Sequence, residues 1–148
     1  TEIDEIVAAG ADMIAVDATK RTRPHGEDLE TFINKIKTKY KSVPLMADVS
    51  TVEEAIYADE LGFDIVAPTL YGYTDETDGL KIDSNNYRVI KQIVKEVKHA
   101  IVLAEGNVFT PEIARTLLDI NVHAVVVGGA ITRPQQITKR FIEAMTTN

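Results

Sequence analysis

Short apolar runs alternate along this chain with longer amphipathic stretches, and this pattern limits the possible folds more than any other feature. The runs occupy residues 13–16, 44–47, 65–67, 101–104 and 124–127. Continuous apolar strands belong to parallel sheets that are buried on both faces. Between the runs, apolar residues recur at helical spacing, for example at Ile90, Ile93 and Val97. The sequence therefore predicts βαβ units and an α/β fold.

The predicted helices begin at capping residues that lie shortly after the strands. The signals are Ser50 with Glu53 as a capping box, Thr110 before Pro111 at the first helical position, and Thr132 followed by Gln135. Gly10 and Gly62 precede two of the strand runs and predict the ends of the helices before them. The segments Gly10-Ala-Asp and Gly62-Phe-Asp each lead into a strand, and this weak repeat favours a symmetric, barrel-like arrangement.

Five predicted strands are too few to close a (β/α)₈ barrel, which needs eight strands and typically ~250 residues. Either the chain forms a smaller open α/β sheet, or it represents the C-terminal five βα units of a barrel. The sequence begins at Thr1, in what reads as the middle of a helix, so we expect that upstream sequence is missing. No linker or change of composition divides the chain, which predicts a single domain over residues 1–148.

Composition excludes several classes of function. The 148 residues include 23 Asp and Glu against 16 Lys and Arg, giving a net charge of −7, which argues against nucleic acid and anionic membranes as partners. No apolar run approaches the ~18 residues that a membrane-spanning helix requires. The chain has no Cys, which excludes a disulfide framework and fits a cytoplasmic enzyme. No glycine-rich nucleotide-binding motif follows any strand.

Glycines near the C-terminus, together with one arginine, predict a site for an anion. Gly106 follows one strand, Gly128 and Gly129 follow the next, and Arg133 lies at the start of the last predicted helix. Barrels commonly bind phosphate on such loops through backbone N–H groups and a helix N-terminus. The alternative is that the glycines only form turns. Arg133 favours the phosphate site, because an arginine in a first helical turn opposes the helix dipole unless an anion neutralises it.

Carboxylates close three of the apolar runs: Asp17, Asp48 and Glu105. Barrel enzymes place catalytic groups at this end of their strands, where a carboxylate can abstract a proton beside a carbonyl or orient a sugar hydroxyl. Alternatively, each carboxylate only accepts hydrogen bonds from nearby backbone N–H groups or pairs with a lysine. A divalent metal is a further alternative, but no paired histidines support it, and no metal site is predicted.

Two loops that follow strands add candidate contacts. Lys20, Arg21 and Arg23 follow the first strand and either attract a phosphorylated substrate or pair with Glu27 and Asp28. Residues 71–83 form the longest predicted loop, which lies where barrels keep their lids. Its tyrosines, Tyr71 and Tyr73, either close over a sugar or pack the loop.

Several motifs, taken in order, resemble the N-acetylmannosamine-6-phosphate 2-epimerases of bacterial sialic-acid catabolism. They are VDATKRTRP (16–24), MADVST (46–51), GFD (62–64) with TLYGYT (69–74), AEGN (104–107) and VGGAITRP (127–134). The resemblance runs nearly end to end. It implies a (β/α)₈ TIM barrel of the ribulose-phosphate-binding type, of which this chain holds only the C-terminal five βα units.

The resemblance also implies an activity and a set of roles. The family interconverts N-acetylmannosamine 6-phosphate and N-acetylglucosamine 6-phosphate by removing and returning the proton on C2, without a cofactor or metal. It implies that Glu105 transfers the proton and that Asp48 contacts the reacting sugar. The phosphate is then held by Arg133 and the loops of Gly106, Gly128 and Gly129. Asp17 and Thr69 lie in matching motifs and are expected to contact the substrate.

This sequence departs from the family's pattern at three points. The family's catalytic lysine comes from a strand upstream of Thr1, so we expect this chain alone to be inactive as an epimerase. Pro68-Thr69 replaces the family's usual Thr-Thr, and Tyr71 replaces a small residue. We expect a sugar phosphate as the ligand, and either a homo-oligomer such as a dimer or association with the missing N-terminal segment. The alternatives are another phosphosugar barrel enzyme and a non-catalytic fragment that retains only phosphate binding.

Overall fold

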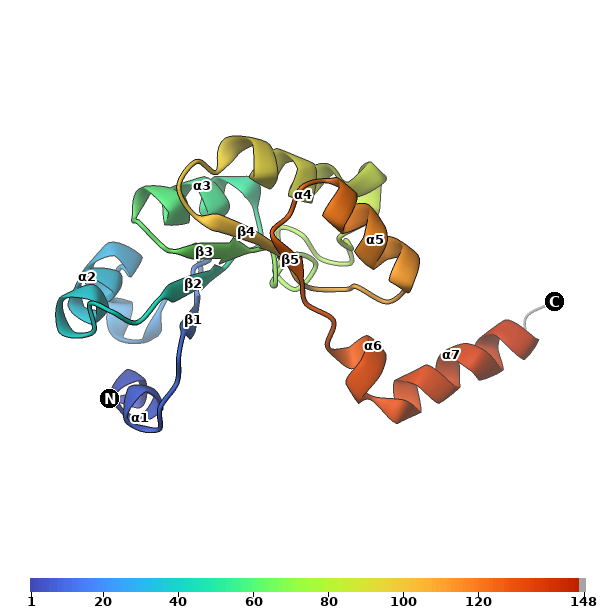
Figure 1. The fold of residues 1–148 in the computed structure, drawn as a ribbon, viewed down its shortest axis with the longest axis horizontal. Helices are drawn as coiled ribbons and strands as arrows, with labels where there is room; N and C mark the ends of the chain where they lie inside the picture. The colour runs from blue at the N-terminus through green and yellow to red at the C-terminus, as the bar shows by residue number, and fades with distance from the viewer. Residues whose placement is uncertain (147–148) are drawn as a thin grey trace.

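The strands form one parallel sheet in which neighbours in sequence are neighbours in space. The computed structural model describes residues 1–146, and its strand order is β1-β2-β3-β4-β5 (Figure 1). The strands are β1 (Ile14–Asp17), β2 (Leu45–Asp48), β3 (Ile65–Ala67), β4 (Ile101–Ala104) and β5 (Ala124–Val125). Sequential order is typical of a βα barrel, whereas a doubly wound sheet reverses its order part-way.

The predicted strand positions are confirmed, with one shortening. β3 and β4 coincide with the predicted runs, and β1 and β2 are each displaced by one residue. β5 ends at Val125 rather than at residue 127, although the Val126 N–H still donates to the Ala104 carbonyl at 2.9 Å. Burial on both faces is confirmed for β2 but wrong for β1. Ala15 and Asp17 of β1 are exposed, because the described residues cover one face of that strand only.

The helices lie mainly to one side of the sheet. They are α1 (Glu2–Ala8), α2 (Leu29–Lys39), α3 (Val52–Glu60), α4 (Ser84–Glu96), α5 (Pro111–Asp119), α6 (Gly129–Thr132) and α7 (Pro134–Thr146), with a 3₁₀ turn η1 (Pro24–Gly26). α3 and α4 pack side by side over the sheet, and α7 points away from it (Figure 1). No helix among residues 1–146 is long and apolar enough to cross a membrane.

Two of the three predicted helix starts need revision. Thr110 caps α5 with Pro111 at the first position, as predicted. The capping box of α3 is shifted by one residue, because Thr51 with Glu54 forms it rather than Ser50 with Glu53. Thr132 is not a cap: it ends α6, and its hydroxyl donates to the Gly128 carbonyl. α7 begins two residues later, at Pro134.

Gly10 and Gly62 lie two residues after the last residues of α1 and α3, and their φ angles are positive, +88° and +79°. Both predicted helix-ending glycines are therefore confirmed.

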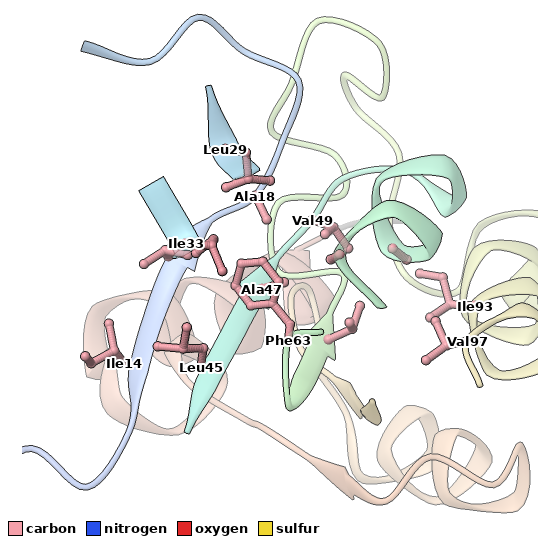
Figure 2. Close-up of a cluster of buried hydrophobic side chains, with 14 of the residues drawn as sticks. Ile14, Ala18, Leu29, Ile33, Leu45, Ala47, Val49, Phe63, Ile93 and Val97 are labelled. Carbon is pink, nitrogen blue, oxygen red and sulfur yellow. The ribbon is translucent and has the colours of Figure 1, made fainter. Parts of the chain in front are cut away.

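The core is a layer of apolar side chains between the helices and the first three strands. Phe63, Ile33 and Ile93 are among its fully buried members, and Figure 2 shows the layer extending from Ile14 on β1 to Ile93 on α4. A second, smaller cluster around Ile90 and Leu117 packs α4 and α5 against β4. These two clusters fix the strands in register, so the carboxyl ends of β1 to β4 reach the same edge of the sheet.

Candidate active site

Strand register brings two of the predicted carboxylates together at the carboxyl edge of the sheet. Asp17 is the last residue of β1 and Asp48 is the last residue of β2, and they are directly paired in the parallel ladder. Asp48 is in turn paired with Ala67, the last residue of β3. Glu105 follows the last residue of β4. All three carboxylates therefore belong to one rim, as the sequence predicted.

Asp48 lies half-buried and is bound by a hydroxyl from the next loop. The Thr69 hydroxyl donates to Asp48 Oδ1 at 2.7 Å. Burial raises the pKa of Asp48 above its ordinary value, and the negative charge of Asp17 raises it further, while the Thr69 bond partly offsets both effects.

Glu105 is also partly buried beside Thr69. Burial raises the pKa of Glu105 above its ordinary value, the charge of Asp48 adds to this, and the Thr69 hydroxyl opposes it. Two neighbouring carboxyl groups that both resist ionisation can hold and release a proton closer to neutral pH than ordinary carboxyl groups. The pair therefore has the electrostatics that proton transfer requires.

Asp17 has a different environment from Asp48. Its Oδ1 accepts hydrogen bonds from both the backbone N–H (2.9 Å) and the hydroxyl (2.6 Å) of Thr19, and its Oδ2 pairs with Arg21. Burial opposes ionisation of Asp17, but the Thr19 hydrogen bonds and the Arg21 charge outweigh it and lower the pKa. Asp17 is thus held ionised and already partnered, and its contact with substrate stays a prediction.

The basic loop after β1 is largely occupied by internal contacts. Arg21 pairs with Asp17, and the Arg23 guanidinium donates to the Asp17 carbonyl and lies 4.6 Å from the centre of the Phe32 ring. The predicted alternative, pairing with Glu27 and Asp28, is wrong for these arginines. Glu27 pairs instead with Lys35, and Asp28 caps α2 through the Thr31 N–H. The loop braces β1.

A cavity of about 320 Å³ lies at the rim beside β4 and β5. Its lining includes six of the predicted site residues: Thr69, Glu105, Gly106, Gly128, Gly129 and Arg133. Asp48 joins this group through Thr69, whereas Asp17 does not line the cavity. A larger cavity of about 530 Å³ lies between α1, α2 and β1; Asp17 lines it, but neither Asp48 nor Glu105 does. The smaller cavity is therefore the candidate active site.

The three glycines have different roles in the structure. Gly106 has a φ of +96°, which residues with a Cβ rarely adopt, and a Cβ there would also lie only 3.1 Å from the Thr69 carbonyl oxygen, so the local backbone favours glycine. A Cβ at Gly128 would meet nothing within 4 Å. Gly129 lies beneath the side chains of Arg133 and Gln136. Gly106 therefore fits the turn alternative, and only Gly128 has open space in which a ligand could approach the backbone.

Arg133 is an exposed cation beside a carboxylate-lined cavity. It follows the last residue of α6 and precedes Pro134 of α7, so it lies between two helices rather than in the first turn of one. Within residues 1–146 its guanidinium makes neither a hydrogen bond nor an ion pair. Such a group is available to bind an anion in the cavity.

The loop of residues 71–83 is anchored at several points. Tyr71 is buried, whereas Tyr73 is exposed and its hydroxyl donates to Asn107 Oδ1 at 3.2 Å. The hydroxyls of Thr74 and Thr77 lie 2.6 and 2.8 Å from that of Ser50. Of the two predicted roles for the tyrosines, Tyr71 packs the loop, and closure of Tyr73 over a sugar stays a prediction.

Comparison with known proteins identifies the family. The sequence matches the family described as "Putative N-acetylmannosamine-6-phosphate epimerase" over residues 1–147. The chain belongs to this epimerase family. Relatives of the same description include a protein of Shouchella clausii, 53% identical over 98% of this chain, and one of Listeria welshimeri, 49% identical over 97%. The chain spans 63% and 61% of the length of these two relatives.

Solved structures agree with the family and with the fold. The N-acetylmannosamine-6-phosphate 2-epimerase of Clostridium perfringens is 45% identical with a TM-score of 0.86, covering 96% of this chain and 60% of that one. A thiamine phosphate pyrophosphorylase of Pyrococcus furiosus is 19% identical with a TM-score of 0.63, covering 98% of this chain and 66% of that one, a likeness of fold alone. The five βα units of this epimerase-family chain thus have the arrangement of part of a (β/α)₈ barrel.

Sequence reasoning missed three polar residues around the epimerase-family site. Asn107 joins the loop after β4 to Tyr73, Gln136 lines the cavity, and Glu54 binds the loops after β1 and β2. The AEGN motif contained Asn107, and the misplaced capping box lay one residue from Glu54. No local signal marked Gln136. Among the described residues, no group of three Asp, Glu or His side chains lies close enough together to hold a metal ion.

Proposed function

We propose that the protein interconverts N-acetylmannosamine 6-phosphate and N-acetylglucosamine 6-phosphate by proton removal and return at C2. The observation that carries this proposal is one cavity lined both by Glu105, with its raised pKa, and by Arg133, whose guanidinium has no ion-pair partner among residues 1–146. One group suits proton transfer and the other suits a phosphate. Family membership supports the same substrate, because the Clostridium perfringens relative is named for this reaction.

The residues suggest a division of labour along the cavity. Arg133 and the backbone at Gly128 and Gly129 hold the phosphate at one end. At the other end the Glu105 carboxylate takes the proton from C2 of the open-chain sugar, and the electron pair moves into an enolate with the C1 carbonyl. Asp48, held by Thr69, contacts the sugar beside that carbon. Returning the proton to C2 restores the aldehyde.

Inversion requires that the proton leaves one face of C2 and returns on the other, so a second acid or base is needed opposite Glu105. Among residues 1–146 no lysine lines the cavity. The two steps can be separated by experiment. A single group exchanges the C2 proton of one epimer with solvent, whereas two opposed groups also produce the other epimer.

The test is proton NMR of N-acetylmannosamine 6-phosphate and of N-acetylglucosamine 6-phosphate in deuterated buffer. We expect deuterium at C2 of at least one epimer, and loss of that exchange in Glu105→Gln. The matched control, Glu30→Gln, changes an exposed carboxylate on α2 and should behave as wild type. Absence of exchange from both epimers with the wild-type protein would contradict the proposal.

The proposal includes a cytoplasmic setting, since phosphorylated sugars are retained inside cells, and an association of this chain with further protein. Phe141 and Met145 on α7 are 67% and 75% exposed, and the outer edges of β1 and β5 have no strand partner in residues 1–146. Exposed apolar side chains and free strand edges favour association. The partner is either a second copy or further βα units. Light scattering of the chain alone tests for the second copy, and a monomer contradicts it.

A further inference from the structure

Glu54 is a buried carboxylate that the proposed reaction does not use. It lies in the first turn of α3 with only 3% of its surface exposed. Its Oε1 accepts the Lys20 N–H at 2.8 Å, and its Oε2 accepts the N–H groups of Ser50 and Thr51 at 2.8 and 3.0 Å. The bonds to Ser50 and Thr51 are local to the start of α3. The bond to Lys20 crosses to another loop.

The loops joined by Glu54 carry two of the candidate site carboxylates. Lys20 comes three residues after Asp17, and Ser50 comes two residues after Asp48. At the strand ends the Ala18 N–H donates to the Asp48 carbonyl at 2.9 Å. Beyond that bond, Glu54 holds the two chain segments together where neither is any longer part of a strand.

The same linkage continues into the loop after β3. Ser50, whose N–H is bound by Glu54, places its hydroxyl between those of Thr74 and Thr77. Thr77 Oγ1 in turn accepts the Gly72 N–H at 2.9 Å. One connected set of hydrogen bonds therefore runs from the loop after β1 to the loop after β3, with Glu54 at its buried centre.

We propose that Glu54 is a positioning residue, which keeps Asp17 and Asp48 opposed at the rim by tying the loop after β1 to the loop after β2. Only the part that concerns turnover rests on the proposed function. Close opposition matters chemically because the charge of Asp17 opposes ionisation of Asp48. Asp17 and Asp48 themselves stay paired in the ladder, but release of the loop after β1 frees the Asp17 carboxylate from Thr19 and Arg21, which lets it turn away from Asp48 and weakens this repulsion.

Shortening the side chain separates the cross-loop bond from helix capping. The amides of Ser50 and Thr51 belong to the same helix start as residue 54, so a carboxylate one methylene shorter still lies next to them. In Glu54→Asp we therefore expect the amides of Ser50 and Thr51 to stay protected from hydrogen exchange. The Lys20 amide belongs to the loop after β1, out of reach of the shorter side chain. It should therefore exchange roughly ten- to hundredfold faster, as expected for loss of a hydrogen bond to a charged group.

Glu54→Gln gives a second measurement. The amide keeps one acceptor oxygen but turns an NH₂ group toward backbone donors, so either the Lys20 amide or the Ser50 and Thr51 amides lose protection. The matched control is Glu53→Gln, an exposed carboxylate on the same turn of α3, which should leave every rate unchanged. Lys20 exchange that equals wild type in both Glu54 variants overturns the proposal, whatever the enzyme does.

Two readouts distinguish positioning from mere stability. Carbon NMR titration of the Asp48 carboxyl in Glu54→Asp should show a pKa lower than in wild type, because Asp17 is no longer held opposite. In the C2 exchange assay kcat should fall severalfold while KM changes little, since the proposed phosphate contacts lie on the loops after β4 and β5. An unchanged Asp48 titration, or a change in KM alone, refutes positioning. No turnover by the wild-type protein refutes the proposed function and leaves the exchange and titration tests standing.

Discussion

Asp59 ties the third helix to the strand that delivers Glu105, and its removal has a calculable effect. The buried carboxylate accepts the backbone N–H groups of Lys98, His99 and Ala100 at 2.8, 3.0 and 2.7 Å. Hydrogen bonds to a charged acceptor contribute roughly 1.5–3 kcal/mol each. Asp59→Asn keeps one acceptor oxygen and turns an NH₂ group toward the remaining donors, so it loses about one such bond and leaves a buried donor unsatisfied, which costs about 1 kcal/mol more. We expect the free energy of unfolding to fall by about 2–4 kcal/mol.

The assay is urea unfolding followed by circular dichroism, with Asp12→Asn, an exposed carboxylate, as the control. At about 2–4 °C per kcal/mol for a chain of this size, the Tm should fall by roughly 5–15 °C. Burial opposes ionisation of Asp59, but the backbone N–H groups of Lys98, Ala100 and His99 lower its pKa. The folded pKa therefore lies below the unfolded value of about 3.9.

The sign of the pH dependence follows from this order. The stabilisation by the carboxylate is complete above about pH 4 and is lost as the pH falls through the folded pKa. The difference between wild type and Asp59→Asn should thus be constant near neutral pH and should shrink in acid. A difference below about 0.5 kcal/mol at pH 7, which is typical of surface substitutions, would refute the reasoning. A difference that grows in acid would refute the assigned ionisation.

Three further predictions concern the cavity. Arg133→Gln should leave the unfolding free energy of the free protein within about 0.5 kcal/mol of wild type. The same substitution should abolish the rise in Tm that a sugar phosphate causes, and an intact rise would exclude Arg133 from the phosphate site. Burial and then the Asp48 charge raise the pKa of Glu105, so Asp48→Asn should lower the Glu105 pKa in a carbon NMR titration, and no change would contradict the coupling. Gly106→Ala should lower the free energy of unfolding in urea by roughly 1–3 kcal/mol, because its Cβ would lie 3.1 Å from a carbonyl oxygen at a φ of +96°. Gly128→Ala, where the Cβ would enter open space, should lower it much less. Equal effects of the two substitutions would refute this argument.

Much of the fold could be predicted because strand and helix signals are local. The runs at 65–67 and 101–104 became β3 and β4 without change, and Thr110 with Pro111 began α5.

The cap of α3 could not be predicted from local signals alone. Ser50 and Thr51 are both hydroxyl residues with a glutamate three positions on, so the pattern cannot choose between them. Tertiary contacts choose Thr51, because the Ser50 hydroxyl is bound by Thr74 and Thr77.

The candidate site was predicted in its membership but not in its internal arrangement. Glycines and an arginine after neighbouring strands indicated an anion site, and six predicted residues line one cavity. No local pattern distinguishes Gly106, where a positive φ and a tight contact favour glycine, from Gly128, where a Cβ would meet nothing within 4 Å. Whether a Cβ collides depends on the loop after β3, which lies more than thirty positions away in the sequence.

The sequence by itself determined which segments become strands and that Asp17, Asp48 and Glu105 end three of those segments, because hydrophobic periodicity and residue order are properties of the chain alone. The tertiary structure decided how those carboxyl groups ionise. Asp17, bound by Thr19 and Arg21, has a lowered pKa, whereas burial raises the pKa values of Asp48 and Glu105. The physical reason is that a pKa depends on burial and neighbouring charge, and both are set by chain segments that only folding brings together.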